Sequence, residues 1–198
     1  MSGYIAFEGV EGAGKSTVIR AVASQFEAEG DEVVVVREPG GSLLGEGIRD
    51  LLLHGPEMIP WAEAQLFAAQ RAQLAAEVIR PALERRAWVL GDRSVYSSLA
   101  YQGHARGLGI DEVRAVNEAG LGGTWPDRVV LLHTDPEAGL RRQRVADRIG
   151  GAGLAFQQLV AEGYRLLAEA EPAKFLVVPV DESHPGAVAS DVCGMLRS

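Results

Sequence analysis

The most constraining feature of this sequence is a glycine-rich segment near its beginning. Residues 9–16 read Gly-Val-Glu-Gly-Ala-Gly-Lys-Ser, the spacing G-x-x-x-x-G-K-[ST] of a phosphate-binding loop. The glycines let the backbone turn so that successive N–H groups point at phosphate oxygens, and the N-terminus of a following helix attracts the same anions. Lys15 supplies a point charge to the outer phosphates, and Ser16 supplies a hydroxyl to Mg²⁺. The segment therefore predicts a site for a nucleoside triphosphate.

The residues on either side of this segment have the pattern that such a loop requires. Residues 4–7 form a short apolar run, and residues 16–29 carry apolar residues at helical spacing, namely Val18, Ile19, Val22 and Phe26. The chain contains seventeen Arg but only two Lys, and one of the two is Lys15, where a compact ammonium is wanted. The alternative is an ordinary glycine-rich turn between a strand and a helix.

Further apolar runs indicate an α/β fold. They cover residues 32–36, 87–90, 128–132 and 175–180, and a helical pattern separates each run from the next. This alternation predicts a parallel sheet with helices on both faces. Ligands of such sheets bind beyond the carboxyl ends of the strands, so the residues that follow each strand are the candidates for a site.

Length and composition favour a single compact unit spanning residues 1–198. The chain has 198 residues, of which 47% are hydrophobic, and its net charge is −8. That charge argues against a nucleic-acid partner, and no apolar run approaches the roughly 20 residues that cross a bilayer. Cys193 is the only cysteine, and residue 1 is followed directly by the first strand pattern. We expect a soluble, cytoplasmic protein with no membrane partner.

Two predicted strands end in charged residues. The second leads into Arg37-Glu38-Pro39-Gly40-Gly41, a turn that can hold charged side chains toward the phosphate loop. The third leads into Asp92-Arg93, where the carboxylate would help to hold Mg²⁺ and the guanidinium could bind a second phosphate. The alternatives are a strand-ending turn with solvated charges in the first case and a surface ion pair in the second.

A predicted helix over residues 61–83 carries a possible nucleobase clamp. Phe67 and Arg71 are four residues apart and project from the same side, so a base could stack on the ring and hydrogen-bond to the guanidinium. Periodicity alone also allows Phe67 to be a core residue. Later in the chain, Gln102 could read an edge of a base, and Tyr101 could pack on a sugar.

An arginine-rich segment precedes a flexible one. Arg141, Arg144 and Arg148 share one helical face and run into Gly150-Gly151-Ala152-Gly153. Cations are favoured at a helix C-terminus in any case, so a solvated face is one interpretation. The other is a lid, at about residues 142–154, that closes over ATP and stabilises charge on the transferring phosphoryl group.

Taken together, the motifs resemble those of bacterial thymidylate kinases over nearly the whole chain. They are Phe7-Glu8-Gly9 with the phosphate loop, residues 37–41, Phe67 to Arg71, Gly91-Asp92-Arg93, residues 97–103, Pro126-Asp127 and Asp147-Arg148-Ile149. The resemblance implies a three-layer P-loop kinase fold with a five-stranded parallel sheet. It also implies a homodimer formed through helices. In such a fold Phe67 would stack on thymine, and Arg71 and Gln102 would contact the base.

The motifs and the resemblance together give a set of candidate site residues. The candidates for binding ATP are Gly9, Val10, Glu11, Gly12, Ala13, Gly14, Lys15, Ser16, Thr17 and Arg144. The candidates for binding dTMP are Glu38, Pro39, Arg49, Phe67, Arg71, Arg93, Ser97, Tyr101 and Gln102. By the resemblance, Arg49 and Arg93 hold the monophosphate, and Glu38 and Tyr101 border the deoxyribose. The candidate catalytic residues are Lys15, Arg93, Arg148 and Glu11, and the candidate Mg²⁺ ligands are Ser16 and Asp92.

The expected reaction transfers the γ-phosphoryl group of Mg-ATP to dTMP, which gives dTDP and ADP for dTTP synthesis. The acceptor is a phosphate oxygen with a second pKa of about 6, so no strong general base is required. A GTPase would need an Asn-Lys-x-Asp segment, and Lys174, preceded by Ala173, does not provide one. A non-catalytic nucleotide sensor and a kinase for another monophosphate remain as alternatives.

Overall fold

A five-stranded parallel sheet forms the centre of the computed structural model, which describes residues 2–142, 148–180 and 185–197. The strands lie in the order β2-β3-β1-β4-β5, and all four neighbouring pairs are parallel. Their bounds are β1 Gly3–Glu8, β2 Val33–Arg37, β3 Trp88–Asp92, β4 Arg128–His133 and β5 Phe175–Pro179. The predicted five-stranded parallel sheet is therefore confirmed.

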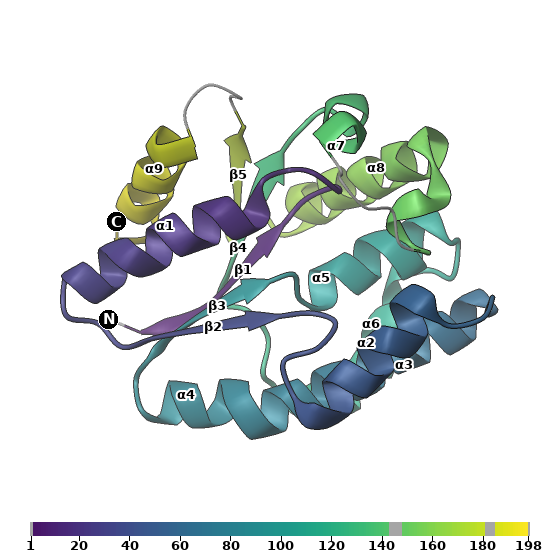
Figure 1. The fold of residues 1–198 in the computed structure, drawn as a ribbon, viewed down its shortest axis with the longest axis horizontal. Coiled ribbons are helices and arrows are strands. Elements are labelled where there is room, and N and C mark those ends of the chain that lie inside the picture. The colour runs from purple at the N-terminus through teal and green to yellow at the C-terminus, as the bar shows by residue number, and fades with distance from the viewer. Residues whose placement is uncertain (1, 143–147, 181–184, 198) are drawn as a thin grey trace.

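Helices cover both faces of the sheet, as Figure 1 shows: α1 and α9 lie together on one side, and α2, α3, α5, α6 and α8 gather on the other. The α-helices are α1 Lys15–Ala28, α2 Leu43–His54, α3 Pro60–Leu74, α4 Arg80–Glu84, α5 Val95–Ser98, α6 Ile110–Leu121, α7 Pro136–Arg142, α8 Leu154–Ala170 and α9 Pro185–Arg197. The chain also has two π-helical segments, Ala75–Ile79 and Leu99–Ala105, and a short 3-10 helix, Gly150–Ala152. Among the described residues, none of the helices has the length and apolarity that a membrane crossing needs.

The most buried strand is the one that leads into the phosphate loop. Residues 4–8 of β1 are all buried, because β3 and β4 flank the strand and helices cover both of its faces. In the sheet, β2 and β3 lie on one side of β1, and β4 and β5 lie on the other. The strand order therefore reverses at β1. The loop that follows β1 therefore opens at the middle of the carboxyl edge, where ligands of α/β sheets bind.

Two strands end later than the apolar pattern predicts. The structure extends β2 to Arg37 and β3 to Asp92, and the Cα atoms of these two residues are paired across the ladder. Sheet hydrogen bonding continues past the last apolar side chain because it depends on backbone groups and not on side-chain polarity. The sequence pattern placed Arg37 and Asp92 just after their strands. In the structure they are the last residues of those strands.

The predicted single helix over residues 61–83 is wrong in its middle. The structure has α3, then a π-helical segment at Ala75–Ile79, and then α4. Pro81 lies in the first turn of α4. Proline has no N–H to continue the α-helical ladder, and its ring crowds the carbonyl of the residue four positions earlier, so the wider π turn accommodates it.

Candidate active site

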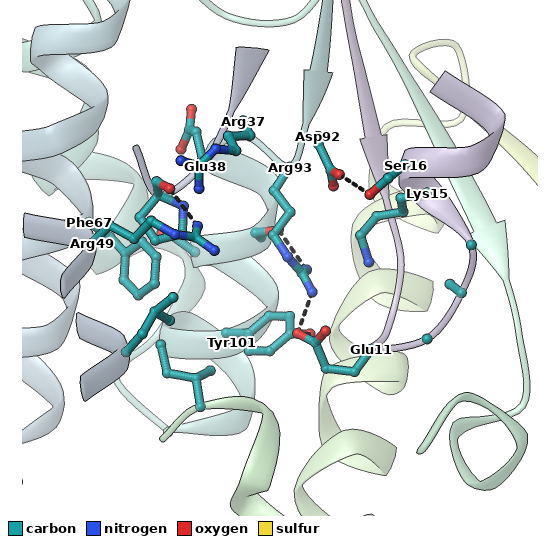
Figure 2. A pocket seen from close by; sticks show the side chains of 18 of the residues that line it. Glu11, Lys15, Ser16, Arg37, Glu38, Arg49, Phe67, Asp92, Arg93 and Tyr101 are labelled. Carbon is teal, nitrogen blue, oxygen red and sulfur yellow. Dashed lines mark hydrogen bonds and ion pairs between the residues drawn. The ribbon is translucent and has the colours of Figure 1, made fainter. Parts of the chain in front are cut away.

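A cavity of about 430 Å³ opens at the carboxyl edge of the sheet. The phosphate loop forms one end and α3 with the turn after β2 forms the other, while Arg93 lies between them (Figure 2). The lining residues are Glu11, Gly12, Ala13, Gly14, Lys15, Ser16, Thr17, Arg37, Glu38, Pro39, Arg49, Leu53, Phe67, Asp92, Arg93, Ser97, Ser98, Tyr101, Gln102 and Ile149. Most of the candidate residues are therefore brought together, although they come from six separate segments.

The phosphate loop has the curled backbone that its glycines permit. Gly12 and Gly14 have φ angles of 70° and 84°, and α1 begins at the next residue, Lys15. Gly12 also packs against α7: a Cβ atom there would lie 2.0 Å from the carbonyl oxygen of Gly139. Only glycine satisfies both the backbone angle and this close approach. The Nζ of Lys15 donates to the carbonyl oxygens of Gly9 and Val10, at 3.1 and 3.0 Å.

The charge of Lys15 is sensitive to alkaline pH. Burial, and next to it the positive charge of Arg93, lower the pKa of Lys15 to about 8, against the opposing effect of Glu11. Lys15 therefore holds its proton below about pH 8 and loses it above. A neutral amine would no longer attract phosphate oxygens as a charge.

We expect kcat/KM for ATP to fall as the pH rises through about 8, because this constant reports ionisation in the free enzyme. The measurement is a series of initial rates across neutral and alkaline pH. In Lys15→Arg the guanidinium stays protonated, so the residual activity should lack this alkaline fall. An unchanged fall in that variant would assign the ionisation to another group.

Arg93 lies at the centre of the cavity and is held by the phosphate loop (Figure 2). Its Nη2 donates to Oε1 of Glu11 at 2.5 Å, and its Nη1 donates to the carbonyl oxygen of Gly9 and to Oγ of Ser97, both at 3.3 Å. The Arg93 charge lowers the pKa of Glu11, so this carboxylate stays ionised despite its burial. The φ angle of Arg93 is 73°, an unfavourable conformation that an arginine adopts where the surrounding structure imposes it.

Ser16 and Asp92 form the contact expected of a magnesium site. The Oγ of Ser16 donates to Oδ2 of Asp92 at 2.6 Å, across the gap between α1 and β3 (Figure 2). Hydroxyl and carboxylate oxygens are the ligands that Mg²⁺ prefers, and this ion is bound by one or two protein groups together with substrate phosphates. The donor set therefore fits. The described residues contain no cluster of three or more His, Cys, Asp or Glu that would hold a metal without such phosphates.

Ser97 is held in place by a buried carboxylate that the sequence analysis did not assign. Glu8, fully buried at the end of β1, accepts from Oγ of Ser97 at 2.6 Å, from Oγ of Ser94 at 2.7 Å and from the hydroxyl of Tyr164 at 2.7 Å. Through these bonds Glu8 connects β1 with α5 and α8. Its burial explains why a carboxylate can stand at the end of an apolar strand, since three hydroxyl groups satisfy it.

Phe67 is both a core residue and a residue of the cavity wall, the two interpretations that its periodicity left open. The side chain is only 8% exposed and belongs to the hydrophobic core, yet it also lines the cavity. Arg49 lies beside it (Figure 2), and its Nη1 donates to the carbonyl oxygen of Pro39 at 2.7 Å. An aromatic ring and a guanidinium are therefore adjacent at the end of the cavity away from the phosphate loop.

Arg71, in contrast, is outside the lining of the cavity. It is 1% exposed, and its guanidinium donates to Oε2 of Glu38 at 2.7 Å, to Oδ1 of Asn117 at 2.5 Å and to Ser94 and Ser98. Burial raises the pKa of Glu38, although Arg71 opposes that rise. Arg71 thus positions Glu38, and a direct contact between its guanidinium and a base stays a prediction.

Only part of the segment predicted to be a lid lies within the described residues. Arg144 lies outside the described residues. Arg142 donates to the carbonyl oxygen of Gly12 in the phosphate loop at 3.2 Å. Arg148 bonds to the other end of the cavity: its Nη1 donates to Oε2 of Glu63 at 2.8 Å and its Nε to the carbonyl oxygen of Leu52 at 2.9 Å. The catalytic role of Arg148 stays a prediction, and it would require this guanidinium to leave Glu63.

Besides Glu8, sequence reasoning gave no role to Leu53, Ser98 and Ile149, which line the cavity. Arg37 lines it too, as expected of the turn that follows the second strand. Sequence reasoning also missed Glu63, which is 1% exposed and contacts Gln102, Arg106 and Arg148. Glu63 lies four residues before Phe67, so the helical spacing that paired Phe67 with Arg71 could also have found it.

The geometry defines a class of protein. A phosphate loop after the central strand, a hydroxyl–carboxylate pair beside it and an aromatic ring across the same cavity are the features of a P-loop kinase that accepts a nucleotide. The family model described as thymidylate kinase matches residues 7–192. The chain belongs to the thymidylate kinase family.

Individual relatives agree with this assignment. The thymidylate kinase of Bacillus pumilus is 48% identical over 93% of this chain and 90% of its own length. That of Bifidobacterium longum subsp. infantis is 44% identical over 100% of this chain and 89% of its own length. The crystal structure of thymidylate kinase from Ehrlichia chaffeensis superposes with a TM-score of 0.83 at 26% identity, and the match covers 100% of this chain and 99% of that one.

Proposed function

We propose that this chain transfers the γ-phosphoryl group of Mg-ATP to the 5′-phosphate of dTMP, which gives dTDP and ADP. The observation that carries the proposal is the single cavity in which the phosphate loop and Phe67 face one another across Arg93 (Figure 2). Thymidylate kinases are the relatives of this chain over almost its full length. ATP would be bound at the phosphate loop, and the thymine base would stack on Phe67.

Catalysis would consist of positioning and charge neutralisation. Lys15 would contact the outer phosphates of ATP, and Arg93 would hold the phosphate of dTMP next to the transferred group. The acceptor oxygen is already ionised near neutral pH, so no side chain has to remove a proton. Glu11 orients Arg93 through their ion pair. Ser16 and Asp92 would hold Mg²⁺, which neutralises developing charge on the phosphates when bound.

The other groups would fix the acceptor. Arg49 lies beside Phe67 and would share the monophosphate with Arg93. Glu38 and Tyr101 both line the cavity and would border the deoxyribose. Oε1 of Glu38 is buried and has no hydrogen-bond partner among the described residues, so it is available to a sugar hydroxyl.

A panel of nucleoside monophosphates, each supplied with ATP with and without Mg²⁺, tests this function. We expect ADP release with dTMP and Mg²⁺ above that with every purine monophosphate. Single-turnover transfer of labelled phosphate separates an enzyme from a non-catalytic nucleotide sensor, which would bind ATP without transferring phosphate. A preference for a purine monophosphate would contradict the stacking arrangement proposed here.

Phe67→Ala is expected to raise KM for dTMP by about 30-fold, because loss of one stacked aromatic costs about 2 kcal/mol. KM for ATP should change by less than about twofold, since Phe67 lies away from the phosphate loop. Phe67→Leu is the matched control, because leucine keeps the apolar volume in the core and removes the stacking face. Equal increases in both KM values would show that Phe67 serves packing alone.

The functional unit would be a homodimer in the cytoplasm, where ATP and dTMP are present. Five large apolar side chains are exposed on α2 and at the start of α3, two helices that lie side by side (Figure 1). They are Leu43, Leu44, Leu51, Ile59 and Trp61. Such a patch is typical of a protein interface. Sedimentation equilibrium should give twice the monomer mass, and Leu44→Asp should give the monomer.

A further inference from the structure

We propose that Glu63 is a positioning residue that sets which atom of Gln102 faces the substrate base, and that it thereby selects bases that carry a ring N–H. This inference rests on the proposed function, since it needs a pyrimidine base at Phe67. Glu63 is in α3, one helical turn before Phe67, and is 1% exposed. It does not line the cavity itself, so its effect on a substrate is exerted through its contacts.

The contact with Gln102 fixes one of two possible amide orientations. Nε2 of Gln102 donates to Oε1 of Glu63 at 2.8 Å, and Gln102 lines the cavity. A carboxylate only accepts hydrogen bonds, so the amide must turn its nitrogen toward Glu63. The carbonyl oxygen is on the other branch of the planar amide. Among the described residues, no group donates to that oxygen, which leaves it as an acceptor for a ligand.

Two arginine side chains hold Glu63 in the place that this orientation requires. Nη1 of Arg148 donates to Oε2 of Glu63 at 2.8 Å, and Nε of Arg106 donates to Oε1 at 3.4 Å. Arg148 is itself fixed by its bond to the carbonyl oxygen of Leu52. A half-turn of the Gln102 amide would place its carbonyl oxygen against this buried carboxylate and leave an acceptor facing an acceptor.

The fixed acceptor distinguishes the pyrimidines by chemistry. Thymine and uracil have an N–H at ring position 3, which can donate to the carbonyl oxygen of Gln102. Cytosine has a lone pair at the same position, so two acceptors would face one another in a buried site. Phe67 stacks on any of these rings, since every base has a π face. The discrimination therefore comes from Gln102 as held by Glu63, and it does not separate thymine from uracil.

The variant Glu63→Gln tests this assignment. An amide at residue 63 can donate as well as accept, so Gln102 is free to adopt either orientation. We expect the ratio of kcat/KM for dTMP to kcat/KM for dCMP to fall about tenfold. Arg106→Gln is the matched control, because it removes one cation from Glu63 and keeps the bond to Gln102. This control should leave the ratio within about twofold of the original protein.

A second variant, in which residues 63 and 102 exchange their carboxylate and amide, distinguishes the proposed role from a failure to fold. The double variant Glu63→Gln with Gln102→Glu restores a carboxylate that can only accept, now at residue 102, and should recover the preference for dTMP over dCMP. An unchanged ratio in Glu63→Gln, or ready use of dCMP by the double variant, would overturn the role of Glu63. Equal use of dTMP and dCMP by the unmodified protein would overturn it too and leave the kinase activity standing. Failure to phosphorylate any pyrimidine monophosphate would instead refute the proposed function.

Discussion

Lys15→Ala is expected to keep the fold and to lower kcat by about 10³-fold, because the variant loses the one lysine charge at the phosphates. The fold should persist because the hydrogen bonds of the Lys15 ammonium go to carbonyl oxygens of the loop, and burial already disfavours its charged form. The measurement is an ADP-release assay with dTMP, together with a thermal unfolding curve for each protein.

Lys174→Ala is the control for this loss, since Lys174 is the only other lysine and lies outside the cavity lining. Its neighbours are Glu171 and the ring of Tyr96, so its removal should affect stability slightly and kcat not at all. A Lys15→Ala protein that turns over at a rate close to that of the unmodified chain would show that Lys15 is not the catalytic charge.

Arg93→Ala is expected to lower kcat/KM for dTMP by about 10³-fold. Two effects combine in this variant. The substrate phosphate would lose the charged partner proposed for it, and Glu11 would lose the guanidinium that keeps its pKa low. A buried carboxylate without its partner is unfavourable next to phosphates. Steady-state kinetics with dTMP varied at saturating ATP would measure the loss.

Two further variants separate these effects. Arg93→Lys keeps the charge but removes the fork that reaches Glu11, Gly9 and Ser97 together, so it should restore only part of the activity. Arg85→Ala removes an exposed arginine paired with Glu32, outside the cavity lining, and should change neither kinetic constant. If Arg93→Ala raised KM for ATP alone, Arg93 would belong to the donor site and not to the acceptor.

The fold was predictable because its evidence in the sequence is local and repeated. Apolar runs alternate with helical patterns, and the observed strands lie within a few residues of those runs. The break in the helix after Leu74 was not predicted, although Pro81 indicates it. The pattern of apolar residues continues through the π turn, so periodicity alone could not reveal the change in backbone geometry.

Site residues were predictable where they follow a strand. They were less predictable where hydrogen-bond partners from other segments decide which way the side chain points. Lys15, Ser16 and Asp92 meet as expected, because parallel strands end at one edge of the sheet. Arg71 has the expected helical position, yet its guanidinium is bonded to Glu38 and Asn117 inside the protein. Only the packed structure brings Asn117 to that place, since it comes from α6.

The sequence by itself determined the phosphate loop, because eight consecutive residues contain both the glycines that allow its backbone and the lysine that fills it. The tertiary structure alone decided which charges face the cavity. Arg93 faces it, whereas Arg148 bonds to Glu63 and is not part of the cavity lining, and Gln102 is. The physical reason is that a buried cation is directed by the nearest carboxylate, and in this protein those carboxylates come from distant segments of the chain.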